Sequence, residues 1–390
     1  MVKLSSIIEN PISGEWGLED LNKTGLPVLR TTNFTNEGII NYNNITTRIF
    51  FKKNIKEKFL KYGDILLEKS GGSNNQPVGR VVFFDKEDDK YLFNNFISIL
   101  RIKNKEEYIS KYIFYLLHYN YINGGTIKFQ NKTTGLHNLQ VKSFINAFQV
   151  EAISINKQCK IIKILDIIYN LIRLKKLQLS KLDQLVKSRF IEMFGDPTLN
   201  IKMWNIYTLG ERCQIITGNT PSRAEKDNYG DFIEWIKSNN ITKNEMYISK
   251  AEEFLSLKGF SKGRYVESGS LLMTCIAGSI NCIGNVAISD RRVAFNQQIN
   301  AIIPKVDNKF YIYWLIRLSQ KNIHTVINKS LKGILNKSQL SAIKFPFPPI
   351  PLQEQFAAFV QQVDKAKSSV KQSLEKLETL KKSLMQEYFG

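Results

Sequence analysis

A short stretch of the sequence occurs twice, half a chain length apart. Residues 182–195 read LDQLVKSRFIEMFG and residues 377–390 read LETLKKSLMQEYFG, an offset of 195 in a chain of 390 residues. Seven of the aligned positions are identical, whereas unrelated segments of ordinary composition would share about one. We therefore expect a chain built from two copies of one structural unit, each of which ends in the same way.

The segments before these stretches have the periodicity of long helices. Residues 157–194 contain no proline or glycine, which predicts a single helix of about 38 residues, roughly 57 Å long. Gly195 stands where a left-handed helix terminator is expected. Before the second helix, residues 345–355 read FPFPPIPLQEQ, and the prolines predict an extended lead-in that ends before Gln353.

Apolar residues at spacings of three and four mark one face of each predicted helix. Two such helices in one chain most simply pair with each other as an intramolecular coiled coil. The alternative is that each helix packs separately on its own domain. The expected seam consists of Ile161, Ile164, Ile168, Leu171, Leu182, Leu185 and Met193 in the first helix, widened by Leu165, Ile172 and Val186, and of Phe356, Val360, Val363, Val370, Leu374, Leu377, Leu384 and Tyr388 in the second.

The segments between the helices also match, in the same order in both halves. Short β-rich runs separated by Gly- and Asn-rich loops predict a mixed sheet with local helices. We therefore expect two copies of one α+β domain, each followed by one long helix. The matched strings are VLRTTNFT (28–35) with WIKSNNIT (235–242), GDILLEKSGGSNNQPVGRV (63–81) with GSLLMTCIAGSINCIGNV (269–286), LFNNFISIL (92–100) with AFNQQINAI (294–302), and YIFYLL (112–117) with YIYWLI (311–316).

The chain is strongly basic, with 55 Lys and Arg against 35 Asp and Glu and a formal net charge of +20. A field of this sign favours a polyanionic partner, such as nucleic acid or an anionic membrane face; the alternative is a soluble surface in a basic proteome. No apolar run approaches the roughly 18 residues of a membrane span. The four scattered cysteines and three histidines lack the spacing of a disulfide framework or a zinc site. We expect a cytoplasmic protein that does not bind a membrane.

No catalytic signature is present. The sequence has no GxxxxGK[ST] or GxGxxG loop for phosphates and no HExxH or GxSxG motif. The string FPPI, residues 347–350, resembles an amino-methyltransferase motif only in part, because Phe347 cannot accept a hydrogen bond from an amino group and Ile350 cannot stack on a base. We interpret it as the rigid lead-in to the helix. We expect a binding protein with no catalytic residue, no metal site and no cofactor of its own.

Two sets of polar residues in matched loops have the chemistry to read base edges. Arg and Lys can hold guanine, Asn and Gln can hold adenine, and Ser and Thr can hold either. The alternative for Asn33 and Asn240 is that they only cap turns. The matched loops differ in side chains, so each copy should read a different sequence. The candidate DNA-binding residues are Arg30, Thr31, Thr32, Asn33, Lys69, Ser70, Ser73, Asn74, Asn75 and Arg80 in the first copy and Lys237, Ser238, Asn239, Asn240, Ser279, Asn281 and Asn285 in the second.

The whole chain, residues 1–390, resembles the specificity subunit of Type I restriction-modification systems. The resemblance rests on the domain–helix–domain–helix order and on three local motifs. One departure is that residues 148–158 before the first helix, FQVEAISINKQ, lack the prolines that precede the second. The motifs are KLDQLVKSRFIEMFGDP (181–197), FPPIPLQEQFAAFVQQVD (347–364), and ITGNTPS (216–222) followed by YGDFIEWIKSNNIT (229–242).

The resemblance implies two tandem mixed α/β target-recognition domains, residues 1–150 and 196–350. A central spacer helix, 151–195, and a C-terminal one, 351–390, would pair as an antiparallel coiled coil. Each domain would read one half of a bipartite site on double-stranded DNA, while the helices set the spacing and dock two methyltransferase subunits. Those partners would carry S-adenosylmethionine and methylate adenine N6, and a motor-nuclease subunit is a further candidate partner. The alternative is a non-catalytic coiled-coil scaffold that binds DNA without strict sequence specificity.

Overall fold

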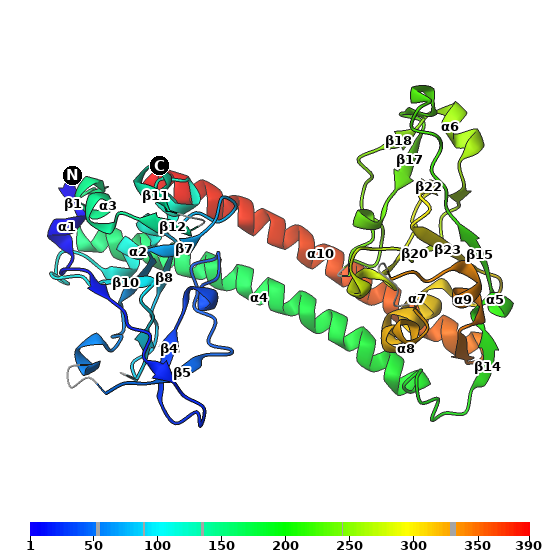
Figure 1. Ribbon diagram of the computed structural model, residues 1–390, viewed down its shortest axis with the longest axis horizontal. Coiled ribbons are helices and arrows are strands. Elements are labelled where there is room, and N and C mark those ends of the chain that lie inside the picture. Colours follow the sequence, from blue (N-terminus) through cyan, green and yellow to red (C-terminus); the bar gives the residue numbers. More distant parts are fainter. Residues whose placement is uncertain (52–54, 89, 134–135, 244, 328–332) are drawn as a thin grey trace. The chain divides into compact units, whose positions relative to one another are not determined.

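The computed structural model describes residues 1–390 apart from 52–54, 89, 134–135, 244 and 328–332. The chain forms two compact units (Figure 1). Unit 1 comprises Met1–Leu174 and Leu374–Gly390, and unit 2 comprises Lys175–Ser373. Each unit therefore contains one α+β domain and a part of both long helices.

The two long helices have the same length. Helix α4 (Ile155–Phe194) and helix α10 (Ile350–Phe389) each contain 40 residues. Gly195 has a φ of +80°, which confirms the predicted left-handed terminator. The prediction that the lead-in stays extended until just before Gln353 was wrong, because α10 already begins at Ile350. Pro351 fits in the first helical turn, where the N–H that proline lacks has no intrahelical acceptor.

The helices pair within each unit. In unit 1, Met385 near the end of α10 belongs to the same apolar cluster as Ile161 near the start of α4. In unit 2, the ring of Phe356 near the start of α10 lies 5.4 Å from the rings of Phe190 and Phe194 at the end of α4. The start of each helix therefore meets the end of the other. The predicted antiparallel pairing is confirmed.

The buried face of α4 is displaced from the predicted seam. Ile164, Leu171 and Leu185, which the spacing placed in the seam, are 39%, 39% and 48% exposed. Apolar residues occupy almost every side of α4 in this region, so two overlapping stripes satisfy the helical period equally well. Contacts with the domains and with α10 select one of them. The buried stripe of α4 is Ile161, Leu165, Ile168, Ile172, Val186, Phe190 and Phe194.

The α+β domain of unit 1 is built on two four-stranded sheets, in the orders β2-β10-β6-β8 and β3-β5-β4-β9. The first sheet is antiparallel throughout, whereas β4 and β9 run parallel. The strands are β1 (Val2–Lys3), β2 (Ile12–Ser13), β3 (Leu18–Glu19), β4 (Leu26–Leu29), β5 (Thr46–Ile49), β6 (Ile65–Glu68), β7 (Ser70–Gly72), β8 (Val81–Phe83), β9 (Leu92–Phe93), β10 (Ile97–Leu100), β11 (Gln130–Thr133), β12 (Leu136–Leu139) and β13 (Gln149–Val150), and the helices are α1 (Leu4–Ile7), α2 (Ser110–Ile122) and α3 (Val141–Ala147).

The domain of unit 2 repeats this plan, with sheets in the orders β15-β23-β20-β21 and β16-β18-β17-β22-β19. Strands β17 and β22 form the parallel pair that corresponds to β4 and β9. The strands are β14 (Asn205–Thr208), β15 (Cys213–Thr217), β16 (Tyr229–Gly230), β17 (Ile233–Ile236), β18 (Phe254–Leu255), β19 (Tyr265–Val266), β20 (Leu271–Thr274), β21 (Val286–Ile288), β22 (Val293–Phe295), β23 (Ile299–Pro304) and β24 (Lys344–Phe347), and the helices are α5 (Leu209–Arg212), α6 (Leu257–Lys262), α7 (Lys309–Leu318), α8 (Gln320–Thr325) and α9 (Lys337–Ala342).

The first sheet of each unit is buried on both faces. In β6, Ile65 and Leu67 belong to the cluster that includes α2 and the helices, whereas Leu66 belongs to the cluster on the opposite face. In β20, Leu271 and Leu272 divide in the same way. Successive side chains of a strand point to opposite faces, so a continuous apolar run suits a strand that is covered on both sides. The two copies expected from the sequence therefore share one core design.

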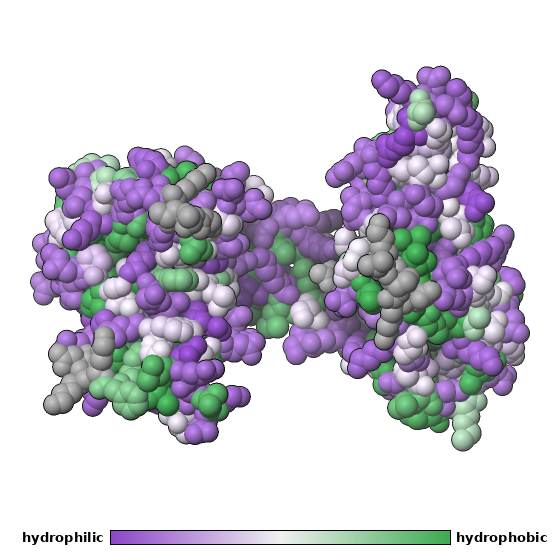
Figure 2. All heavy atoms as spheres, in the orientation of Figure 1, coloured by the Kyte–Doolittle hydropathy of each residue, from purple (hydrophilic) through white to green (hydrophobic). Residues whose placement is uncertain are grey.

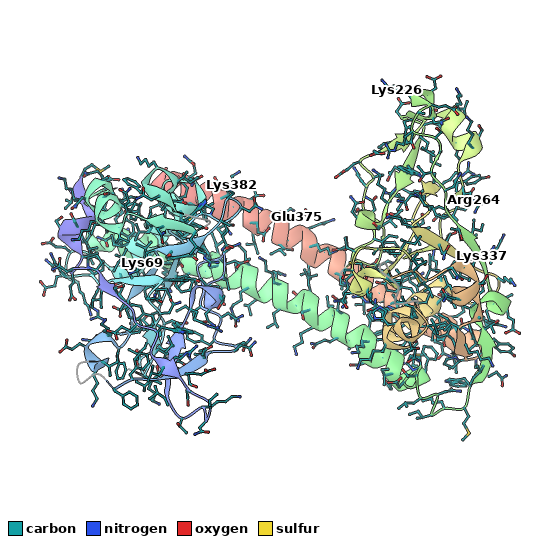
Figure 3. The ribbon with its side chains drawn as sticks, in the orientation of Figure 1. Lys69, Lys226, Arg264, Lys337, Glu375 and Lys382 are labelled. Atoms are coloured by element: carbon teal, nitrogen blue, oxygen red, sulfur yellow. The ribbon has the colours of Figure 1, made fainter. Side chains whose placement is uncertain are left out.

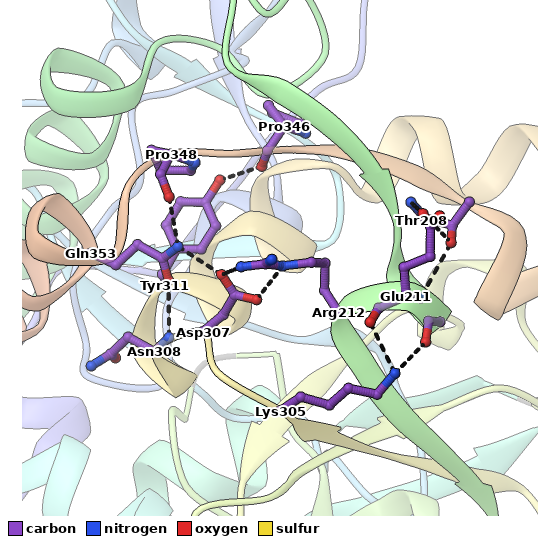
Figure 4. A network of polar contacts seen from close by, with 11 residues as sticks. Thr208, Glu211, Arg212, Lys305, Asp307, Asn308, Tyr311, Pro346, Pro348 and Gln353 are labelled. Atoms are coloured by element: carbon purple, nitrogen blue, oxygen red, sulfur yellow. Dashed lines mark hydrogen bonds and ion pairs between the residues drawn. The ribbon is translucent and has the colours of Figure 1, made fainter.

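A buried glutamine in the first turn of each long helix joins that helix to its domain. The Gln158 Oε1 accepts the N–H of Ile109 and the Gln353 Oε1 accepts the N–H of Asn308, each at 2.9 Å. The Gln353 side-chain amide also donates to the Asp307 carboxylate at 2.8 Å and to the Pro348 carbonyl at 2.9 Å (Figure 4). The first helix therefore begins with the same anchor as the second, although it lacks the prolines.

The Gln353 anchor predicts a large effect of its removal. Gln353 is fully buried, so Gln353→Ala leaves the Asn308 N–H and the Pro348 carbonyl without this partner, whereas Arg212 still donates to the Asp307 carboxylate. We expect a loss of about 2–4 kcal/mol in the free energy of unfolding of unit 2, because each buried unsatisfied group costs roughly 1–3 kcal/mol. Urea denaturation measures the loss. Gln355→Ala, on the exposed side of the same turn, is the control and should change stability little.

The surface of each unit is mostly hydrophilic on the face shown in Figure 2, with hydrophobic side chains in patches and along the long helices. On α4, the exposed apolar residues include Ile167 at 51% and Leu177 at 47%. These residues do not amount to a membrane span: none of the helices in the described part of the chain is both long and apolar enough to cross a bilayer.

Candidate nucleic-acid interface

Matched turns follow the parallel strand of each second sheet. The Asn33 Oδ1 accepts the N–H of Arg30 and the Asn240 Oδ1 accepts the N–H of Lys237, both at 3.0 Å. The Asn33 side-chain amide donates to the Asn41 carbonyl at 3.1 Å. Both asparagines are buried, at 3% and 5% exposure. Turn capping therefore accounts for Asn33 and Asn240, and neither presents its amide at the surface.

The exposed positions of these turns differ in chemistry between the units. Thr32 in unit 1 and Asn239 in unit 2 are exposed at equivalent positions, and each follows a half-buried hydroxyl residue, Thr31 or Ser238. Arg30 is half-buried, with its Nη2 3.5 Å from a backbone carbonyl. Arg30, Thr31 and Thr32 thus belong to one turn in unit 1, and Ser238 and Asn239 to the matching turn in unit 2. Their contact with DNA stays a prediction.

Lys237 is held by an acidic neighbour. Its ammonium donates to the Glu253 carboxylate and lies 5.3 Å from the centre of the Trp235 ring. Arg223 binds the other oxygen of Glu253 at 2.7 Å. The hydrogen bond from Lys237 lowers the pKa of the Glu253 carboxyl, and Arg223 adds to that effect. The hydrogen bond to Glu253 uses one of the three N–H donors of the Lys237 ammonium, so a contact with DNA would have to be made beside this carboxylate.

Arg80 is only 7% exposed, and its side chain holds the turn that contains Asn33. Its Nε donates to the Glu68 carboxylate at 3.1 Å, and its Nη1 and Nη2 donate to the carbonyls of Phe34 at 3.1 Å and Thr31 at 2.9 Å. Burial raises the pKa of the Glu68 carboxyl, and the guanidinium opposes that rise. Arg80 therefore fixes the position of the turn, and its donors are committed within the chain.

The equivalent position in unit 2 has no such ion pair. The N–H of Glu68 donates to the Arg80 carbonyl, and the N–H of Thr274 donates to the Asn285 carbonyl, each at 2.9 Å. Asn285 thus takes the place of Arg80, and Thr274 that of Glu68. The Asn285 Oδ1 and the Thr274 Oγ1 are buried and have no hydrogen-bond partner among the described residues.

The two Gly-rich loops, 69–80 and 275–285, carry the remaining candidates. In loop 69–80, Ser73, Asn74 and Asn75 are exposed at the tip, which Ser73 and Gln76 close by mutual backbone hydrogen bonds of 2.8 and 3.2 Å. Ser70 is turned inward and donates to the Asn138 side chain at 2.5 Å. In loop 275–285, Ser279 and Asn281 are exposed. These tips offer hydroxyl and amide groups to a partner.

Lys69 and Cys275 occupy equivalent positions at the start of the two loops. The N–H of Lys69 donates to the Phe96 carbonyl and that of Cys275 to the Gln298 carbonyl, both at 2.8 Å. The Lys69 ammonium donates to the Ser13 hydroxyl (Lys69 is labelled in Figure 3). Burial, with a smaller contribution from a neighbouring lysine, lowers the pKa of Lys69. The sequence matched the strings but did not indicate this exchange of a cation for a thiol.

Sequence reasoning missed one pair of exposed amides. Asn95 and Gln297 precede β10 and β23 in the matched strings LFNNF and AFNQQ, and both are exposed. The signal was present, because paired amides in an otherwise apolar string are unusual in a strand. Neither residue was selected, since the strings were read only as strands.

The comparisons with known proteins agree with this architecture. The family model described as the Type I restriction modification DNA specificity domain matches residues 1–184 and 201–379. The chain belongs to the Type I restriction-modification specificity subunits. The predicted family and fold class are therefore confirmed.

Individual relatives of this specificity subunit are distant. It is 30% identical over 152 residues to the Type I restriction enzyme HindI specificity subunit of Haemophilus influenzae, covering 37% of this chain and 32% of that protein. It is 26% identical over 194 residues to the MjaIX specificity subunit of Methanocaldococcus jannaschii, covering 48% and 44%. The matched region thus spans less than half the length of either relative.

Two solved structures share the fold over the full length of the chain. The Type I restriction-modification S subunit from M. genitalium has a TM-score of 0.59 at 17% identity, covering 100% of this chain and 95% of that one. A chain from a study of complex assembly and conformational transition of the type I R-M system has a TM-score of 0.52 at 14% identity, covering 100% and 96%. At these identities the likeness concerns the fold.

Proposed function

We propose that this specificity subunit reads a bipartite site on double-stranded DNA, with domain 1–150 on one half-site and domain 196–350 on the other. The observation that carries the proposal is the pair of equivalent turns and loops with different exposed side chains. Thr32 is aligned with Asn239 when the units are compared, and Asn95 is aligned with Gln297. Two units of one fold with different surface groups suit two different short sequences.

The net charge of +20 supports a nucleic-acid partner, since Lys and Arg supply the sequence-independent affinity for phosphates. The proposed base contacts exclude the buried residues Asn33, Arg80 and Asn240, and also Ser70, whose hydroxyl donates to the Asn138 side chain. The remaining residues are Arg30, Thr31, Thr32, Lys69, Ser73, Asn74, Asn75, Lys237, Ser238, Asn239, Ser279, Asn281 and Asn285.

The repeated helix ends support a second proposal, the docking of two methyltransferase subunits. Leu185 and its counterpart Leu380 have apolar side chains, yet they are 48% and 46% exposed. On the same helix side, the identical pairs Ser188/Ser383 and Glu192/Glu387 are also exposed. A surface that occurs twice in the sequence and does not contribute to the hydrophobic core suits two copies of one partner. That partner would carry S-adenosylmethionine, and the specificity subunit would have no catalytic role.

Mutation of the repeated surface tests the docking. Leu185→Asp and Leu380→Asp should each weaken one partner by roughly 30-fold, because a central apolar contact is worth about 2 kcal/mol. Co-purification and mass measurement of the complex give the number of methyltransferase subunits per chain. Ser180→Asp, on an exposed position of α4 outside the repeat, is the control. Two bound partners on the double variant would contradict this role of the leucines.

Methylation mapping tests the main proposal. Deletion of the gene from its host should remove N6-methyladenine from one bipartite motif, and expression of the chain should restore it. The loss occurs because the partner alone has no means of finding the motif. Restored methylation that follows no sequence motif would favour the alternative of a DNA-binding scaffold without strict specificity.

A further inference from the structure

A cavity of about 370 Å³ lies in unit 2 at the start of loop 275–285. Asn300 is one of the lining residues and is only 2% exposed, whereas Gln297, Asn336 and Lys337 are exposed. Lys337 on the rim and Arg264, whose Nη1 donates to the carbonyl of the lining residue Thr217, lie on the same side of unit 2 in Figure 3. The lining includes Thr217, Cys275, Gln297, Asn300, Asn336 and Lys337.

A lysine occupies the equivalent space in unit 1. The N–H of Leu139 donates to the Lys69 carbonyl at 2.8 Å, and the N–H of Leu335 donates to the Cys275 carbonyl at 2.9 Å, which places Lys69 and Cys275 in register. The Lys69 ammonium reaches the Ser13 hydroxyl. In unit 2 the shorter Cys275 leaves this space open. Burial raises the pKa of the Cys275 thiol to about 12, so the thiol is neutral at pH 7 and supplies no cation.

The rim of the cavity offers hydrogen-bond donors. The Gln297 Oε1 accepts the Thr220 hydroxyl, so its –NH₂ group is the part available to a ligand. The Asn336 Oδ1 accepts the N–H of Gln339 at 2.8 Å, so the –NH₂ group of Asn336 is also the part available to a ligand. Lys337 adds an exposed ammonium. Among the described lining residues there is no carboxylate.

We propose that this cavity is the subsite at which unit 2 reads a guanine. The major-groove edge of guanine presents two acceptors, O6 and N7, whereas the edge of adenine presents one acceptor and one donor. Two amide –NH₂ groups and an ammonium complement the guanine edge. The inference rests on the proposed function, because it assigns one base pair of the second half-site. Unit 1 has no such subsite, since Lys69 fills it.

Gln297→Glu tests the subsite. The carboxylate keeps an acceptor for Thr220 but replaces the donor with an acceptor, which suits the N4 amino group of cytosine. We expect one position of the second half-site to change from G to C, with a preference altered by about 5- to 150-fold, the equivalent of roughly 1–3 kcal/mol. The full chain with its methyltransferase partner selects from a randomised duplex DNA library, and sequencing gives the preference.

Asn95→Asp is the matched control, because it places the same charge at the equivalent exposed position of unit 1 and should leave the second half-site unchanged. Cys275→Met is a second variant, which fills the cavity with a side chain that has no hydrogen-bond donor and should abolish the guanine preference. Thermal unfolding checks that both proteins are folded. An unchanged second half-site with uniformly weaker binding would show a phosphate contact and overturn the subsite. Failure of the unaltered chain to select any bipartite motif would instead overturn the proposed function.

Discussion

Insertion of one heptad into each long helix, after Leu174 in α4 and after Val370 in α10, is expected to abolish recognition of the original DNA site. The insertions stand at matching points of the two helices, and seven residues preserve the apolar period. The insertion lengthens the helices by about 10 Å at roughly 1.5 Å per residue. That length corresponds to about three base pairs, which also turn the duplex by roughly a quarter to a third of a turn.

Methylation mapping of cells that contain the longer chain measures the effect. The expected result is loss of the original spacing, and a motif with a longer gap between unchanged half-sites would support the spacer role further. The control replaces seven existing residues at each point with the inserted heptads, so that composition changes and length does not. Full methylation of the original motif, with its original gap, would disprove the role of the helices as a ruler.

Replacement of residues 1–150 by the corresponding domain of a related specificity subunit is expected to change one half of the methylated motif completely and the other not at all. The two domains have separate cores, and their candidate base contacts lie in separate turns and loops. The exchange should keep the contacts of the domain with the helices, including the hydrogen bond between the Tyr119 hydroxyl and Gln386 at 2.5 Å. Loss of these contacts would detach the exchanged domain from the part of the long helices that belongs to unit 1.

Methylation mapping again provides the measurement, and replacement of residues 196–350 is the reciprocal control, which should change the other half. A domain exchange that alters both halves of the motif would contradict independent reading. An exchange that alters neither half would place recognition outside the domains.

The duplication made much of the fold predictable. Identity at the helix ends, such as Phe194 with Phe389, established the repeat, and the absence of proline and glycine established the length of α4. The face of α4 was predicted only in part, because Ile164 and Leu165 satisfy the helical period equally well and only Leu165 is buried. Contacts with residues far away in the sequence, such as Met385, decide which of them is buried.

The candidate site was predicted less well, for a physical reason. The sequence shows that Asn33 and Arg80 have groups that can bind bases, but it does not show that a turn and a buried carboxylate already use those groups. Lys237 likewise has a partner, Glu253, that lies 16 positions away. Whether a polar side chain is available depends on its neighbours in space. The exposed loop tips were easier to predict, since Gly and Asn cluster there.

Unit 1 takes its residues from both ends of the chain, and this sets the order in which the protein can mature on the ribosome. The face of α4 that contains Ile161 and Leu165 is complete only when Met385 and its neighbours pack on it. From residue 174 to residue 374 the ribosome adds 200 residues, which takes about 10–40 s at roughly 5–20 residues per second. During that interval, an apolar stripe of the nascent chain is uncovered. A chaperone that binds during synthesis would therefore meet this stripe of the first half, which stays uncovered until Leu374–Gly390 are added.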